Sequence, residues 1–179
     1  MRLIQAENKI QYKTIHELYK RAFPACEKKS FHLMKTKQAK KLVDIWYIEN
    51  KGEFIGLAIT MKWNDLVLLD YFAINDSLRS GGYGSKALKL LQDYYADSRF
   101  FLEIESVYGN ADNQALRERR KKFYLRNNMK EMNLMVNLFG TDMEVLGYNC
   151  EFNYTEYLSV YTNVYGKYKS RKIQKLSFE

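Results

Sequence analysis

The sequence predicts an α/β fold, with residues 1–179 in a single domain whose mixed, mostly antiparallel twisted sheet is flanked by helices. Three β-type runs follow one another over residues 43–74. A glycine-rich stretch then separates the last run from an amphipathic helix, and another β-type run follows that helix. The length of 179 residues, the 46% hydrophobic content and the single proline fit one domain with its own core.

The first part of the chain is predicted to hold a short strand and two helices. Residues 2–5 form the strand. Apolar side chains then recur at the spacing of a helix face, at Ile15, Leu18, Tyr19 and Ala22. This helix is expected to end near Pro24. The lysine-rich segment 27–41 is expected to form a partly exposed helix or an ordered loop that borders the substrate site.

A meander of three antiparallel strands is predicted next, over residues 43–49, 53–63 and 66–74. Gly52 marks the first tight turn and Asn64 the second. The third strand is almost continuously apolar, so we expect it to be central and buried on both faces.

The second half of the chain continues the alternation of helices and strands. A helix is predicted over residues 82–96 and a strand over 99–106, parallel to strand 66–74 because a crossover helix separates the two. The remaining elements are predicted as a helix, a pair of strands and a last helix before a basic tail, over residues 113–127, 133–149 and 154–165.

The stretch RSGGYG, residues 79–84, is predicted to bind a pyrophosphate. It stands before a helix, whose first turn offers unpaired N–H groups and the positive end of the helix dipole. Gly82 and Gly84 allow close approach of the backbone, and Gly81 adds freedom to the turn. A Walker A loop is excluded because no glycine precedes a G-K-[ST] triplet by five residues. A Rossmann fingerprint is excluded because Ala87 replaces its third glycine and antiparallel strands precede the loop.

The pattern that remains is R-x-x-G-x-G, formed by Arg79, Gly82 and Gly84. With its flanking strand and helix, the stretch DYFAINDSLRSGGYGSKAL resembles the GNAT acetyltransferase superfamily, and the order of elements agrees over most of the chain. The resemblance implies an enzyme that moves an acetyl group from acetyl-CoA to a primary amine of a small molecule or peptide, directly in a ternary complex. It implies contacts of acetyl-CoA with Phe72, Ala73, Ile74, Arg79, Ser80, Gly81, Gly82, Tyr83, Gly84 and Ser85.

Two residues are candidates for catalytic proton transfer under this resemblance. Tyr124 matches the family tyrosine that protonates the leaving thiolate, and the reference pKa of a phenol, ~10, is close enough to that of a thiol, ~8.5, for this transfer. The alternative is that Tyr124 and Phe123 form a core aromatic pair. Glu103 matches a glutamate that relays the amine proton through water, but Glu105 lies on the same face of the strand and the sequence does not rank the two.

The helix before Tyr124 departs from the family pattern, because Arg117 and Arg120 stand where an asparagine and an alanine are usual. The basic run 117–122 therefore has two interpretations. It either contacts the 3′-phosphate of the co-substrate or forms a solvated helix face on which Glu118 pairs with Lys122.

Other residue types limit the remaining classes of function. Cys26 and Cys150 lack a C-x-x-C partner, which favours free thiols and a cytoplasmic location. No metal is expected, because His16 and His32 have no further ligands at metal-binding spacing. We expect no membrane segment, since no apolar run approaches 18 residues. A homodimer is compatible with this interpretation.

Two alternatives to an acetyltransferase remain open. The net charge of +8, the run RERRKK and 15 tyrosines would suit a nucleic-acid-binding protein, although this leaves the loop 79–84 without a role. The other alternative is a catalytically silent module that binds acetyl-CoA. The acceptor amine is not identified, but segments 24–41, 107–114 and 132–150 are expected to select it. Acidic residues that would attract a cationic amine are Glu27, Glu103, Glu105 and Asp142.

Overall fold

The computed structural model describes residues 1–25, 27–109 and 111–177. The chain forms two compact units, Met1–Lys62 with Leu69–Tyr94 and Trp63–Leu68 with Tyr95–Glu179. Strand β4 (Leu66–Ile74) contributes to both, because its first three residues belong to the second unit and the rest to the first.

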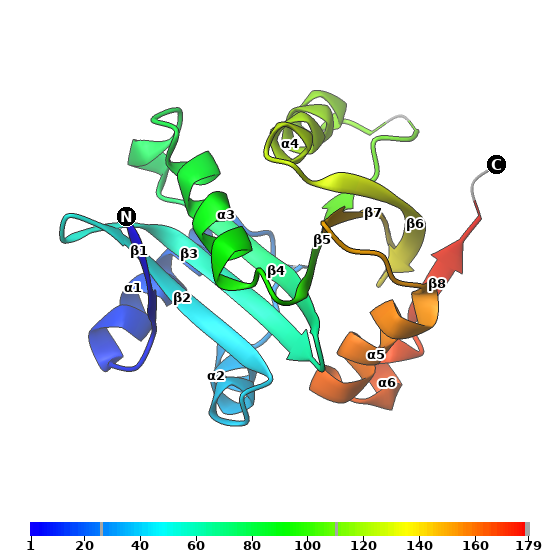
Figure 1. Ribbon diagram of the computed structural model, residues 1–179, viewed down its shortest axis with the longest axis horizontal. Coiled ribbons are helices and arrows are strands. Elements are labelled where there is room, and N and C mark those ends of the chain that lie inside the picture. Colours follow the sequence, from blue (N-terminus) through cyan, green and yellow to red (C-terminus); the bar gives the residue numbers. More distant parts are fainter. Residues whose placement is uncertain (26, 110, 178–179) are drawn as a thin grey trace. The chain divides into compact units, whose positions relative to one another are not determined.

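The first unit begins with a short strand and two helices and continues into a meander. Its further elements are β1 (Arg2–Gln5), α1 (Lys9–Ala22), α2 (Phe31–Ala39), β2 (Val43–Asn50), β3 (Glu53–Trp63), a 3-10 turn (Asp76–Leu78) and α3 (Tyr83–Tyr94). The strands follow the order β1-β2-β3-β4, and both β1-β2 and β2-β3 are antiparallel. Figure 1 shows α3 lying across these strands.

Local sequence signals explain where the helices of this unit begin. Asn8 caps α1 by accepting a hydrogen bond from the N–H of Gln11, and the Gln11 side chain accepts one from the N–H of Asn8. The helix buries Ile15, Leu18 and Tyr19, which are the apolar positions that predict it. The residues of helix α2 are exposed or half-buried, except for the buried Met34.

Strand β4 changes character along its length. Residues 66–69 are all buried, as predicted for a central strand. From Asp70 onward buried and half-buried residues alternate, with Tyr71 and Ala73 buried. The predicted burial on both faces therefore applies only to the first part of the strand.

The second unit alternates strands with helices along the chain and ends in a short strand. Its elements are β5 (Arg99–Glu105), α4 (Gln114–Arg126), β6 (Lys130–Leu138), β7 (Thr141–Tyr148), α5 (Tyr154–Tyr165), α6 (Lys167–Ser170) and β8 (Ile173–Leu176). With the start of β4, the strand order is β4-β5-β7-β6-β8. The pairings β5-β7, β6-β7 and β6-β8 are all antiparallel.

The predicted fold class, a mixed and mostly antiparallel sheet flanked by helices, is confirmed. From the sequence, no secondary structure is assigned to the basic tail. It forms α6 and then β8, which pairs with residues 135–138 of β6. Each of these elements has four residues, too few to show a helical or strand period in the sequence. None of the described helices has the length and apolar character required to span a lipid bilayer.

Candidate active site

The predicted pyrophosphate loop joins β4 to α3 within the first unit. After the 3-10 turn, Arg79 is extended (φ −64°, ψ 154°), and α3 begins at Tyr83. Ser80 and Gly82 both have a left-handed backbone, with φ of 68° and 73°. A Cβ on Gly82 would meet no atom within 4 Å, so glycine is favoured there by backbone conformation and the space beside it is open.

The start of α3 has the properties of an anion site. Its first N–H groups have no partners within the helix, and its first turn contains no acidic residue to compete for them. Gly81 also lies close to Tyr83, because a Cβ there would be 3.1 Å from the Tyr83 ring and would require a small shift of that side chain. The backbone of this turn can thus approach a phosphate closely.

Arg79 lies at the edge of this loop and is held weakly. Its guanidinium is 2.7 Å from a carboxylate oxygen of Asp76, and both side chains are more than half exposed. Exposed pairs of this kind contribute about 0–1 kcal/mol. Arg79 can therefore exchange Asp76 for a phosphate oxygen at little cost.

The end of β4 is held in place by β3. A Cβ on Gly56 would lie 2.2 Å from the carbonyl oxygen of Ala73, so the two backbones approach closely at this point. The N–H of Asn75 donates to the carbonyl of Ile55 at 2.8 Å. These contacts fix the backbone next to Phe72 and Ile74, the positions predicted to contact acetyl-CoA.

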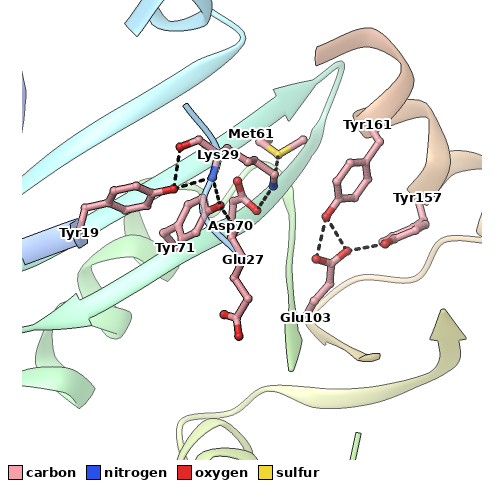
Figure 2. Close-up of polar contacts among 9 residues, drawn as sticks. All are labelled: Tyr19, Glu27, Lys29, Met61, Asp70, Tyr71, Glu103, Tyr157 and Tyr161. Atoms are coloured by element: carbon pink, nitrogen blue, oxygen red, sulfur yellow. Dashed lines mark hydrogen bonds and ion pairs between the residues drawn. The ribbon is translucent and has the colours of Figure 1, made fainter. Parts of the chain in front are cut away.

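Glu103 of β5 accepts hydrogen bonds from two tyrosines of α5, as Figure 2 shows. Tyr161 donates at 2.8 Å to one carboxylate oxygen, and Tyr157 donates to the other. Burial, and after it the charge of Glu103, raises the pKa of Tyr157 well above its usual value, so this phenol remains a donor. Sequence reasoning missed both tyrosines, although their i, i+4 spacing places them on one face of the last helix.

Tyr124 lies near the end of α4 and is half-buried. Its ring meets Phe123 edge to face, with centroids 5.1 Å apart, so the alternative aromatic pair exists. Burial raises the pKa of Tyr124 to about 12, although the charge of Arg120 opposes the shift. Within the described part of the chain its hydroxyl makes no hydrogen bond, and at neutral pH the phenol keeps a proton to donate.

The basic run 117–122 is largely paired with acidic residues of the same unit. Arg117 and Arg120 contact the two carboxylate oxygens of Glu105 at 3.0 and 2.8 Å. Lys121 is 2.9 Å from Glu131 and 2.5 Å from Glu144. The expected pair between Glu118 and Lys122 is present at 3.9 Å. The run therefore mainly stabilises α4 against the sheet.

Histidine and cysteine side chains take no part in a metal centre among the described residues, where no cluster of three or more His, Cys, Asp or Glu is found. His16 stacks on Phe31 at 4.6 Å, and burial lowers its pKa. Cys150 is a free thiol whose pKa is raised by burial. Cys26 lies outside the described residues.

The fold and the glycine-rich loop at a helix start define a class of protein, the α/β acyltransferases that use coenzyme A thioesters. A model of the acetyltransferase (GNAT) family matches residues 12–123, and the chain belongs to this family. The assignment confirms the predicted resemblance and the predicted class of enzyme, an acetyltransferase with acetyl-CoA as co-substrate. Among curated proteins, none matches this sequence significantly.

Solved structures share the fold at low sequence identity. A putative GNAT acetyltransferase from Bacteroides thetaiotaomicron is 21% identical, with a TM-score of 0.76 over 93% of this chain and 99% of that one. An aminoglycoside 6′-N-acetyltransferase complexed with coenzyme A is 13% identical, with a TM-score of 0.66 over 82% and 96%. A chimera of the spermidine N-acetyltransferase SpeG from Vibrio cholerae and hSSAT is 16% identical, with a TM-score of 0.65 over 83% and 96%.

Lys121 and Lys122 provide a matched test of the basic run. Replacing Lys121 by Met leaves Glu144, whose side chain is 6% exposed, without its cation and should lower the free energy of unfolding by about 3–5 kcal/mol. Lys122→Met, at a side chain that is 76% exposed, should change it by about 0–1 kcal/mol. Urea denaturation measures both, and equal losses in the two variants would contradict a structural role for Lys121.

Proposed function

We propose that the protein is an N-acetyltransferase that transfers the acetyl group of acetyl-CoA to a primary amine of a small molecule or peptide, directly within a ternary complex. The observation that carries this proposal is the start of α3, where a left-handed loop precedes a helical turn with no acidic residue. Acetyl-CoA would supply an activated acetyl group as a thioester. Its pyrophosphate is the anion that such a turn accommodates.

The first unit is proposed to bind the co-substrate. The N–H groups from Gly82 to Ser85 would donate to the pyrophosphate, and Arg79 would add charge-assisted hydrogen bonds in place of its exposed pair with Asp76. The backbone of residues 72–74, held from the β3 side, would pair with the pantetheine arm. An N–H group at Phe72 or its neighbour would face the thioester carbonyl and stabilise the negative charge that develops on its oxygen.

The second unit is proposed to supply the residues for two proton transfers, to the leaving thiolate and from the attacking amine. As the amine nitrogen forms a bond to the thioester carbon and the carbon–sulfur bond breaks, Tyr124 would give its proton to the departing thiolate. The proton lost by the amine would leave through water held by Glu103, whose carboxylate is oriented by Tyr157 and Tyr161. The products are an N-acetylated amine and free coenzyme A.

The structure weakens the two alternative functions. A nucleic-acid surface needs unpaired cations, but Arg117, Arg120 and Lys121 are bound to carboxylates. A catalytically silent module would not require Tyr124 to keep a free hydroxyl. We also propose that the enzyme is cytoplasmic, which the free thiol of Cys150 supports, and that it can form a homodimer.

Gly82→Trp should abolish acetyl-CoA binding, because the indole would occupy the open space in front of α3. Gly52→Trp is the matched control, since Gly52 also has a positive φ, of 85°, and open space around its Cβ but lies in the β2–β3 turn. Calorimetry with acetyl-CoA should show binding to wild type and Gly52→Trp alone. Retained micromolar affinity in folded Gly82→Trp would remove the loop from the site.

Tyr124→Phe should lower kcat by about 10²-fold or more without weakening acetyl-CoA binding, because general acid catalysis contributes about 10²–10⁴-fold. Since the pKa of Tyr124 is raised to about 12, the wild-type phenol stays protonated over the accessible alkaline range. Its deprotonation should therefore cause no loss of activity between about pH 7 and 10. Thiol-release assays measure both effects, with Tyr168→Phe, at an exposed tyrosine, as the control. Unchanged turnover in Tyr124→Phe would exclude it as the acid.

A further inference from the structure

Asp70 on β4 has one carboxylate oxygen that is paired and one that is not (Figure 2). Its side chain is 5% exposed, and Oδ1 lies 2.5 Å from the Lys29 ammonium. Oδ2 is buried, and no residue in the described part of the chain donates a hydrogen bond to it. A buried carboxylate oxygen without a donor is costly, and such atoms are rare in folded proteins. This position therefore has the capacity for a further donor.

The groups around Asp70 bind a primary ammonium group, namely that of Lys29. The Lys29 ammonium is 5.4 Å from the centroid of the Tyr71 ring and 4.0 Å from the sulfur of Met61. A carboxylate, an aromatic face and a polarisable sulfur together suit a desolvated cation on an aliphatic chain. The Lys29 side chain is 12% exposed, so the site already excludes most water.

Lys29 belongs to segment 24–41, which the sequence predicts to select the acceptor. Its backbone is held separately from its side chain, because its N–H donates to the hydroxyls of Tyr19 at 2.8 Å and Tyr71 at 3.1 Å. Tyr71 in turn donates to the carbonyl of Glu27 at 2.7 Å. The ammonium can thus leave Asp70 by rotation of its own side chain while these backbone contacts persist.

We propose that Asp70 binds an ammonium group of the acceptor, and that Lys29 fills this place as an internal mimic until the acceptor displaces it. The identity of the ligand as an acceptor rests on the proposed acetyltransferase function. By strand alternation, Asp70 and Phe72 share one face of β4 and are about 7 Å apart along it. An amine held by Asp70 would therefore lie beside the residues proposed to position the thioester. An ammonium held by Asp70 has no lone pair with which to attack, so the acceptor class is an unbranched diamine whose other amine is neutral and reacts with the thioester.

A binding experiment tests the ammonium site without any reliance on activity. Lys29→Ala removes both the ammonium and its aliphatic stem, and n-butylammonium chloride replaces what is missing. At 10 to 100 times its Kd, this salt should raise the Tm of Lys29→Ala by about 3–11 °C over the same concentration of sodium chloride. The double variant Lys29→Ala/Asp70→Asn should not respond, and n-butanol, which lacks the charge, should stabilise neither protein.

The proposal is overturned if Lys29→Ala shows no stabilisation, if the double variant responds equally, or if n-butanol acts as well as the ammonium salt. The double variant also avoids an unpaired buried charge, which would otherwise destabilise the fold. Circular dichroism of both variants establishes that each is folded before the titration.

A kinetic experiment tests whether the bound ammonium belongs to the acceptor. Lys29→Ala removes the competing occupant, so kcat/KM for 1,4-diaminobutane, which can place one ammonium at Asp70 and react through its other amine, should rise about tenfold. Lys29→Ala/Asp70→Asn should lose this gain, with the KM for acetyl-CoA unchanged in both. An equal kcat/KM in the two variants would overturn the role of Asp70.

The two proposals fail in distinguishable ways. Calorimetry with acetyl-CoA on the wild-type protein decides the proposed function alone, whatever the outcome at Asp70. If acetyl-CoA binds and n-butylammonium does not stabilise Lys29→Ala, the ammonium site is wrong and the function stands. If n-butylammonium stabilises Lys29→Ala through Asp70 and acetyl-CoA does not bind, the ammonium site stands and its assignment to an acceptor is wrong.

Discussion

The first turn of α3 carries backbone N–H groups for which the helix itself provides no hydrogen-bond acceptor, and the chemistry proposed for this protein depends on them. Ser80 and Gly82, which both have a left-handed backbone, precede this turn, and a Cβ on Gly82 would meet no atom within 4 Å. Strand β4 precedes this loop, and the backbone of Gly56 in β3 approaches Ala73 closely near the end of β4. We propose that the pyrophosphate of acetyl-CoA supplies the missing acceptors.

Charge is used differently in the two units. In the first, Arg79 has an exposed and weakly held partner, and the start of α3 is free of carboxylates. In the second, the residues that account for much of the basic character of α4 are neutralised by Glu105 and Glu144. A net charge of +8 therefore does not translate into a continuous basic surface on this helix.

Much of the fold could be predicted because its signals are local. The period of Ile15, Leu18 and Tyr19 predicts α1, and glycines next to an arginine before an amphipathic stretch predict the loop. The contacts of Glu103 with Tyr157 and Tyr161 could not be predicted, because they join residues 54 and 58 positions apart. These depend on how α5 packs against β5, which no local pattern encodes.

The residues that would bind the acceptor amine also could not be predicted from local sequence patterns. Glu27, Glu103, Glu105 and Asp142 are acidic residues that the sequence offers as attractants for an amine. The structure pairs Glu103 with tyrosines, Glu105 with arginines and Asp142 with the amide of Asn137. The sequence does not single out Asp70, because this residue lies within an almost continuously apolar strand that is predicted to be buried. Its pairing with Lys29 spans 41 positions and becomes visible only in the folded chain.

Hydrogen exchange at the amides of Gly82, Tyr83, Gly84 and Ser85, measured with and without acetyl-CoA, tests the central claim most directly. If these N–H groups bind the pyrophosphate, saturating acetyl-CoA should slow their exchange by about tenfold or more, because each gains a hydrogen bond that free α3 lacks. Binding of acetyl-CoA with unchanged exchange at all four amides would contradict the account, since the co-substrate would then be held elsewhere.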